Sequence, residues 1–283
     1  MAWLVLHGGE NDYNRAMRGN YSRLGAFRII EEFLVPHSTV TIEETAQAET
    51  AQALHDLLPS PDDPAFPGGA DLFGNLILEL SQQIEYDNAA QDRFVRVIQR
   101  LQESDRVKKH IPRRAGAGGF GRYETMPQMA LSLVHYSAPQ MDRDRNEEHF
   151  LNVRAFIARL CRVGVLQAQA WLVSEMRAAL EDTLPDDMDM VSIQGAAIIV
   201  LFAGEWLFEE VARAPKLDEI HDNDMWRTGT YYTGPRYGFT RWRHWQRLLM
   251  WVQRTVPLDQ EARRLMFNAA WYMYGIARCL PSY

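Results

Sequence analysis

The sequence predicts an all-α protein, an irregular multi-helix orthogonal bundle with two central buried helices. Several segments carry apolar residues at the i, i+3, i+4, i+7 spacing of one helix face. No long stretch alternates apolar and polar residues, and no β-branched runs lie between turn signals. Residues 190–212 and 265–276 are apolar almost all the way round, so we expect other helices to surround both. No repeat period typical of a solenoid is present.

The first half of the chain predicts an arm and four helices. Residues 1–20 mix Gly, Asn, Asp and Arg without periodicity, which predicts an N-terminal arm whose order depends on docking. Helices are expected over 21–34, 42–58, 72–86 and 91–102. Pro36 and Pro59 end the first two, because proline cannot continue a helix, and a Pro/Gly loop runs to residue 69.

The second half predicts five more helices, over 147–163, 166–183, 190–212, 239–256 and 259–280. Before them, residues 108–127 are basic and then glycine-rich, which is typical of an exposed connection. We therefore expect one domain over 21–283, with a subdivision near 105–127 as the alternative.

Composition bounds the partners and the compartment. The formal net charge of −7 repels a phosphate backbone or an anionic membrane at long range, which predicts no nucleic-acid and no membrane partner. Cys161 and Cys279 lie in apolar helical patterns typical of buried thiols, and two cysteines cannot form the framework of a secreted scaffold. The first apolar run is too short for a signal peptide, and the longest uncharged apolar segment, 195–204, is shorter than the roughly 18 residues of a membrane span. A cytoplasmic location is expected.

Three local motifs invite a cofactor or metal interpretation. Residues 116–121 match G-x-G-x-x-G, but a dinucleotide site needs a preceding strand and a following helix, and neither is predicted. Asp186, Asp187 and Asp189 invite comparison with the acidic metal motif of terpene cyclases, yet the spacing departs from it, and we interpret these acids as N-terminal helix caps. The His- and acid-containing segments 147–149 and 221–224 lack metal-ligand spacing. No cofactor and no metal are predicted.

Polar residues on the apolar helices are the first candidates for a site. Gln194 and Glu205 are eleven residues apart, so both point the same way from the most apolar helix. A buried Glu205 carboxylate needs a partner, and Arg159 or Arg241 would suit. Two interpretations stay open, an internal ion-pair network that fixes helix register and a ligand pocket.

Aromatic residues near the C-terminus are the second set. His244 interrupts an aromatic seam of Trp242 and Trp245, and Asn152 and Arg159 form a polar stripe on the 147–163 helix. The preceding loop interleaves rings with glycines, so it predicts either a lid over a cavity or a long connection anchored by its rings. The rings of this loop are Trp226, Tyr231, Tyr232 and Tyr237.

Four segments resemble a known family. They are residues 71–79 followed by 91–94, residues 151–160, residues 176–181 and residues 238–245. Together they resemble a fungal family of helical proteins catalogued only as a domain of unknown function, DUF3632. The resemblance implies a soluble, helical, intracellular protein and no activity, cofactor or catalytic residue. His244 stands where the family would lead us to expect a second aromatic residue.

The functional hypothesis is an aromatic cavity between the last two helices, the 190–212 helix and the Gly/Tyr loop. It would bind a mostly apolar small molecule, such as a fungal secondary metabolite, and catalyse a cofactor-independent rearrangement or cyclisation. His244 or Glu205 would transfer protons, and Arg159 or Arg241 would hold a developing anion. The residues expected to contact the ligand are Asn152, Gln194, Trp226, Tyr231, Tyr237, Trp242, Trp245 and Tyr272.

The alternative is a non-catalytic helical interaction or scaffold protein. A fully packed aromatic seam and a large exposed apolar patch would favour that alternative.

Overall fold

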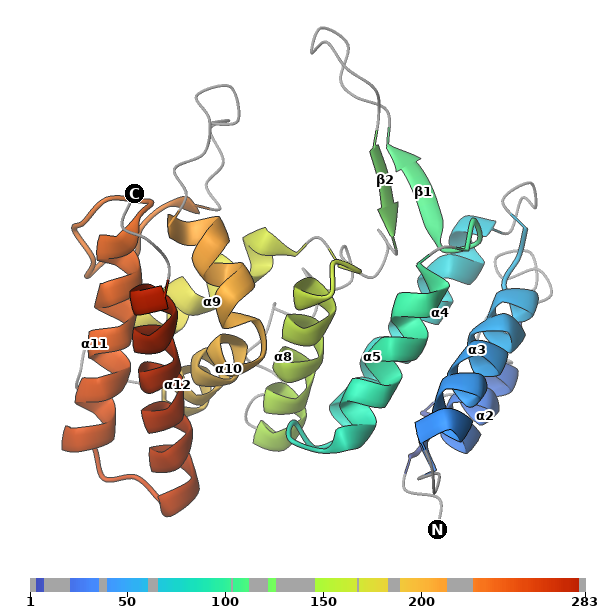
Figure 1. The fold of residues 1–283 in the computed structure, drawn as a ribbon, viewed down its shortest axis with the longest axis horizontal. Helices are drawn as coiled ribbons and strands as arrows, with labels where there is room; N and C mark the ends of the chain where they lie inside the picture. The colour runs from blue at the N-terminus through green and yellow to red at the C-terminus, as the bar shows by residue number, and fades with distance from the viewer. Residues whose placement is uncertain are drawn as a thin grey trace, which may run out of the picture. The chain divides into compact units, whose positions relative to one another are not determined.

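A computed structural model describes residues 4–7, 21–35, 40–60, 66–102, 104–111, 122–125, 146–166, 168–182, 189–212 and 226–279. These residues form nine helices and one two-stranded sheet, which confirms the all-α class (Figure 1). Internal contacts divide the chain into two compact units. Unit 1 is Met1–Phe156 with Val163–Gln167, and unit 2 is Ile157–Arg162 with Ala168–Tyr283. This division falls inside a helix and away from residues 105–127; a single domain stays a prediction.

Unit 1 is built on four helices: α2 (Arg23–Leu34), α3 (Val40–Leu57), α4 (Phe66–Gln82) and α5 (Ala89–Leu101). Helix α2 contacts the other three, and α3 also contacts α5. The Ser22 side chain accepts a hydrogen bond from the Gly25 amide and so caps α2, while Asn88 caps α5 in the same way. Residues 147–156 of α8 (Glu147–Arg162) complete this core through Phe156, whose ring lies 5.1 Å from that of Phe94.

The described part of the N-terminal arm, residues 4–7, docks on the end of α4. The Val5 amide donates to Gln83 Oε1 at 2.7 Å, and Gln83 Nε2 donates back to the Val5 carbonyl at 2.8 Å. The His7 amide donates to Glu79, and Leu4 is buried. These contacts hold residues 4–7 against unit 1.

A short antiparallel hairpin is the part of unit 1 that the sequence does not predict. Strand β1 (Lys108–Ile111) pairs with β2 (Arg122–Thr125), with Lys108 opposite Thr125. The glycine motif 116–121 falls between them, outside the described residues. A strand after the motif, in place of a helix, is not the arrangement that a dinucleotide site requires.

Unit 2 is built around α10 (Met190–Ala212), which contacts α9 (Gln169–Leu180), α11 (Phe239–Thr255) and α12 (Gln260–Cys279). Asp189 caps α10 by accepting a hydrogen bond from the Val191 amide at 3.1 Å, as expected, whereas Asp186 and Asp187 lie outside the described residues. A kink at Ala203 bends α10. Among the described helices, α10 alone has the length and apolar composition of a membrane span, and 56% of that stretch is buried inside the protein.

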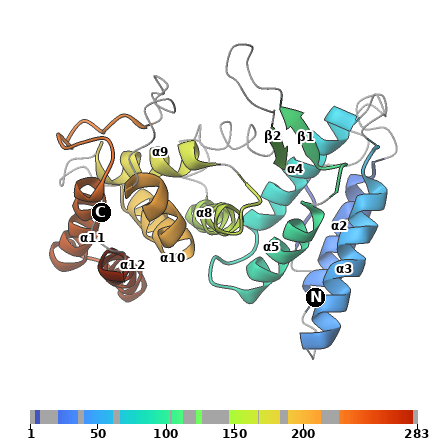
Figure 2. The ribbon, with the colours of Figure 1, turned by 45° about the horizontal axis from the view of Figure 1, so that its top comes forward.

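The expectation that other helices surround residues 265–276 is wrong. One face of α12 is buried, but the opposite face exposes aromatic side chains to solvent. The prediction failed because aromatic residues count as apolar in a pattern, although their rings also occur at surfaces that bind partners. Only α10 is a central helix of unit 2. Figures 1 and 2 show α11 and α12 lying side by side as an antiparallel pair.

Candidate functional site

A buried ion pair joins the end of α9 to the start of α11. Arg241 Nε lies 2.6 Å from Glu181 Oε1, and Arg241 Nη2 lies 3.0 Å from Glu181 Oε2. Both side chains are fully buried. The planar guanidinium matches the carboxylate with two parallel hydrogen bonds, which is the strongest geometry for such a pair. The sequence analysis offers Arg241 as a partner for Glu205, whereas the structure pairs Arg241 with Glu181.

The remaining donors of Arg241 hold the loop 226–238. Its Nη1 donates to the carbonyls of Trp226 and Arg236, and its Nη2 donates to the Arg227 carbonyl. Glu181 Oε2 in turn accepts the Gly229 amide at 2.7 Å. This network therefore uses one charge pair to satisfy backbone groups of a loop that forms no regular secondary structure of its own.

The same loop is pinned to the residues that follow α9. The Tyr231 amide donates to the Glu181 carbonyl at 2.8 Å, and the Thr230 amide donates to Asp182 Oδ1 at 2.7 Å. Gly229 approaches so closely that an added Cβ would lie 2.4 Å from the Glu181 Cβ. Of the two interpretations of this loop, an anchored connection fits these contacts better than a lid.

The aromatic seam of α11 is packed. Trp242 and Trp245 are 0% exposed, and their ring centroids lie 6.4 Å apart. Trp242 also meets the Phe208 ring edge to face at 5.1 Å and donates its indole N–H to the Met273 carbonyl. Trp245 donates its indole N–H to Glu181 Oε1 at 2.7 Å. Their polar atoms are satisfied inside the protein, as buried indoles require.

His244 and Arg159, two more of the residues predicted to be catalytic, also have partners inside the protein. His244 Nε2 shares a hydrogen bond with the Leu180 carbonyl at 3.2 Å, and its ring lies 4.7 Å from that of Tyr232. The Arg159 guanidinium lies over the Phe202 ring, 3.5 Å from its centroid. These contacts fit the internal network better than they fit groups aimed at a ligand.

Glu205 lies elsewhere than predicted. Its side chain is exposed, and it pairs with neither Arg159 nor Arg241. It hydrogen-bonds Tyr272, and burial together with the Glu205 charge raises the pKa of the Tyr272 phenol above its usual value near 10. The sequence argument failed because it treated α10 as buried on every side. In the structure Gln194 is partly exposed and Glu205 is exposed.

Other predicted ligand contacts have local partners or lie at the surface of their own unit. Asn152 belongs to unit 1, where its Nδ2 donates to the Gln82 carbonyl and its backbone carbonyl accepts a hydrogen bond from the buried Gln91 side chain. In unit 2, Trp226 contacts the Tyr237 ring at 5.3 Å, and Tyr231 is 49% exposed. Each of these side chains therefore has a local structural setting of its own.

The two cysteines differ, contrary to the expectation that both are buried. Cys161 is buried, and burial raises the pKa of its thiol to about 12. Cys279 is exposed at the last residue of α12. Across the described residues, no cluster of three or more His, Cys, Asp or Glu side chains is placed to hold a metal ion.

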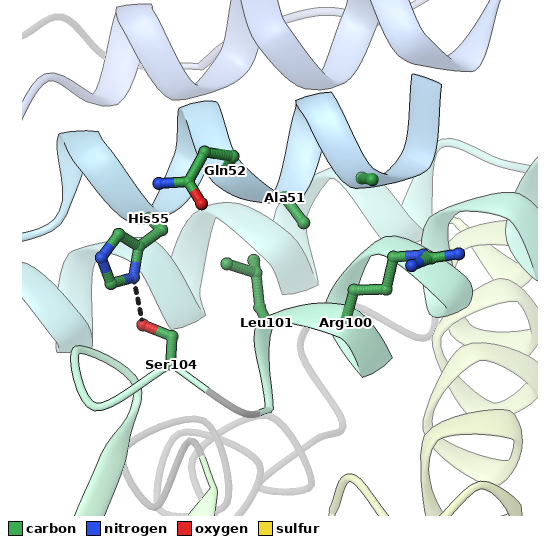
Figure 3. Close-up of a pocket in the computed structure, with 7 residues that line it drawn as sticks. Ala51, Gln52, His55, Arg100, Leu101 and Ser104 are labelled. Carbon is green, nitrogen blue, oxygen red and sulfur yellow. Dashed lines mark hydrogen bonds between the residues drawn. The ribbon is translucent and has the colours of Figure 1, made fainter. Parts of the chain in front are cut away.

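A small groove of about 280 Å³ lies between α3 and α5 in unit 1 (Figure 3). It is lined by Ala48, Ala51, Gln52, His55, Arg100, Leu101 and Ser104. Figure 3 shows His55 pointing toward Ser104, and His55 Nδ1 lies 2.7 Å from Ser104 Oγ. Ser104 Oγ also accepts the Arg106 amide, and Arg106 Nη1 donates to the carbonyls of His55 and Leu58. These bonds tie the turn after α5 to the end of α3 and give His55 and Ser104 structural partners.

The exposed face of α12 is the feature that the sequence analysis missed. Phe267, Trp271 and Tyr274 are 42%, 51% and 41% exposed and follow the i, i+4, i+7 spacing of one helix face. Their rings contact edge to face, with centroids 6.1 Å apart for Phe267 and Trp271 and 5.5 Å apart for Trp271 and Tyr274. We call these three residues the aromatic ladder. Large exposed rings in a contiguous row are uncommon on a surface that contacts only water.

Arginines flank the aromatic ladder at both ends. Arg264 lies one turn before Phe267 on the same face, and the Arg278 guanidinium lies 5.6 Å from the Tyr274 ring centroid. More widely, residues 239–279 contain seven arginines and two carboxylates, a formal charge of +5 in a chain of formal charge −7. Arg241 is the member of this group that pairs inside the protein. The α11–α12 surface is therefore basic and aromatic within an acidic chain.

Comparison with known proteins gives one match. A family model described as a protein of unknown function (DUF3632) matches residues 75–249, more than half of the chain. No curated protein and no solved structure matches the sequence. Glu181 and Arg241 fall inside the matched residues, whereas α12 follows them.

Proposed function

We propose that this chain, which belongs to the DUF3632 family of proteins of unknown function, is a non-catalytic interaction protein that presents the aromatic ladder of α12 to a partner polypeptide. The observation that carries this proposal is the ladder itself, a row of three mutually contacting rings on a solvent-exposed helix face. Tyr, Trp, Phe and Arg are the residues enriched in protein interfaces, and Trp, Tyr and Arg dominate their binding energy.

The packing of α12 against the rest of unit 2 suits this role. On its other face α12 buries Leu265, Ala269 and Met273 against the rest of unit 2. Gln246 of α11 donates to the Ala270 carbonyl, and Trp242 donates to the Met273 carbonyl, so side-chain bonds cross between the two helices. A binding surface on a rigid helix loses little conformational freedom when a partner binds.

The small-molecule hypothesis finds less support in the geometry. It needs His244, Glu205, Arg159 and Arg241 to converge on open space, yet Arg241 is saturated by Glu181 and loop carbonyls, and Glu205 faces solvent. Trp242 and Trp245 are fully buried, and their indole N–H groups donate to acceptors inside the protein. The described groove between α3 and α5 is lined by none of the predicted ligand contacts.

The test is site-specific photocrosslinking followed by reconstitution. A photoreactive phenylalanine analogue is placed at Tyr274 in one protein and at Tyr231 in a control, because both positions carry similarly exposed tyrosines. The partner crosslinked only from position 274 is then purified and titrated against the wild type, Trp271→Ala and Tyr231→Ala. We expect Trp271→Ala to weaken binding about thirtyfold or more, as for a hot-spot residue, and Tyr231→Ala to leave it unchanged. Equal affinities for all three proteins would overturn the proposal.

A further inference from the structure

We propose that the partner of the aromatic ladder is an acidic amphipathic helix, with carboxylates placed to meet Arg264 and Arg278. This inference rests on the proposed function and names the chemistry of the partner. It follows from the spacing of the two arginines, from the geometry of the rings and from the charge of the surrounding surface.

The arginines are placed symmetrically about the centre of the ladder. Arg264 precedes Trp271 by seven residues, and Arg278 follows it by seven. Seven residues are close to two helical turns, so both arginines lie on the same face as Trp271, about 21 Å apart along the axis. A partner helix that lies along α12 would therefore meet a cation, a row of rings and a second cation in turn.

This symmetry disfavours a second copy of the chain as the partner. If two α12 helices paired antiparallel about Trp271, Arg264 of one copy would face Arg278 of the other. If they paired parallel and in register, each arginine would face its own equivalent. Both orientations place like charges opposite one another, which opposes association.

Ring geometry disfavours a nucleic acid. Bases stack on open ring faces, whereas neighbouring rings of the ladder are tilted by 68° and 85° so that the edge of one covers the face of the next. The formal charge of −7 on the whole chain repels any anionic partner at long range, so it opposes a phosphate backbone or an anionic membrane more strongly than a helix that carries two carboxylates. A helix with carboxylates at two positions and apolar side chains between them pairs with Arg264 and Arg278 while carrying less negative charge than a nucleic acid or an anionic membrane.

The experiment uses the full chain and fluorescein-labelled helical peptides of about 21 residues, which span the distance from Arg264 to Arg278 with about one turn to spare at each end. The first peptide has glutamates seven residues before and after a central leucine on its apolar face. The second has the same composition but carries both glutamates on the opposite face. In the third, glutamine replaces both glutamates. A thymidine oligonucleotide and vesicles containing an anionic lipid are titrated in parallel, and binding is followed by fluorescence anisotropy or sedimentation.

We expect the first peptide to bind roughly tenfold more tightly than the second and third, because two exposed charge pairs each add about threefold in affinity. The double variant Arg264→Gln/Arg278→Gln should bind the three peptides equally, whereas Arg28→Gln, an exposed arginine in unit 1, should behave as the wild type. Trp271→Ala should weaken all three complexes. The preference of the wild type should fall as salt is raised.

The outcomes separate the two proposals. Equal affinities of the wild type for the acidic and glutamine peptides, with a loss in Trp271→Ala, would overturn the acidic partner and leave the interaction surface standing. If no peptide binds, or if the oligonucleotide or the vesicles bind more tightly than the acidic peptide, both proposals fail. A dimer in sedimentation that Trp271→Ala dissociates would replace the acidic helix with a second copy as the occupant.

Discussion

Glu181 and Arg241 stand 60 residues apart in the sequence and meet in a two-point ion pair that is fully buried. Glu181 follows the last residue of α9, and Arg241 lies in the first turn of α11. The pair closes around the loop 226–238, whose backbone both side chains bind. Its role is to fix the path of this loop and the register of α11.

The first prediction concerns the stability of unit 2. Glu181→Gln leaves the Arg241 charge buried without its counterion, and removal of one partner of a buried pair costs about 3–5 kcal/mol. Asp182→Asn is the matched control, because this neighbouring carboxylate is exposed and should cost about 1 kcal/mol or less. Urea denaturation followed by circular dichroism measures both. A similar small loss in the two variants would contradict the structural role of the pair.

Arg241→Lys provides the second prediction. Lysine keeps the charge but carries its three donors on one nitrogen, in place of the planar fork that binds Glu181 and three carbonyls. We expect a loss of about 2 kcal/mol or more, since several buried acceptors lose their donors. In the Glu181→Gln background the further loss should be smaller, because the two residues share one network. Additive losses in a double-mutant cycle would show that they act independently.

Much of the fold could be predicted because it depends on local patterns. The helix expected over 190–212 appears as Met190–Ala212, and Asp189 caps it. Helix α5 begins two residues earlier than predicted, because Asn88 supplies the cap. The hairpin β1–β2 was missed since Lys108–Ile111 is short and mostly charged, which is not typical of a strand.

The candidate sites could not be predicted to the same extent. Nothing local in the sequence distinguishes Glu181 from Glu205 as the partner of Arg241, because the choice depends on how helices far apart in the sequence pack. The apolar pattern of 265–276 likewise cannot show that Phe267, Trp271 and Tyr274 face solvent. A sequence pattern shows which residues of a helix are apolar, but it does not show which of them are buried. A helix with apolar residues on two faces therefore looks the same whether the second face packs inside the protein or is exposed.

The third prediction tests the close approach of the loop to α9. An added methyl group at Gly229 would lie 2.6 Å from the Glu181 carbonyl carbon, so Gly229→Ala must displace backbone. We expect a loss of about 1–3 kcal/mol, the usual range for overpacking at a well-packed site. Gly275→Ala is the control, because a methyl group there meets no atom within 4 Å and should stabilise α12 slightly. Thermal unfolding of the two variants separates these effects. Equal melting temperatures would show that the loop accommodates a methyl group at Gly229 without a loss of stability.

The fourth prediction concerns the thiols. Burial keeps Cys161 protonated at all pH values well below about 12, whereas Cys279 is exposed. Under native conditions at pH 8, iodoacetamide should therefore modify one of the two cysteines, and both in denaturant. Intact mass spectrometry counts the adducts. In Cys279→Ser the native protein should remain unmodified, and rapid labelling of that variant would show that Cys161 is accessible.

The fifth prediction follows the Glu205 carboxylate through its neighbour Tyr272. Burial, and then the charge and hydrogen bond of Glu205, raise the pKa of this phenol above 10. A phenol whose pKa is raised by folding stabilises the folded state below pH 10, and this contribution is lost as the pH rises through the folded pKa. Glu205→Gln removes the negative charge, so the Tyr272 pKa should fall toward 10, and the loss of stability at alkaline pH should lessen.

Carbon-13 NMR of ring-labelled tyrosine follows the titration, with Tyr272→Phe assigning the signal. Glu209→Gln, an exposed acid one turn further along α10, is the control and should leave the Tyr272 pKa nearly unchanged. A Tyr272 titration that is identical in the wild type and Glu205→Gln would show that the two side chains do not interact in solution.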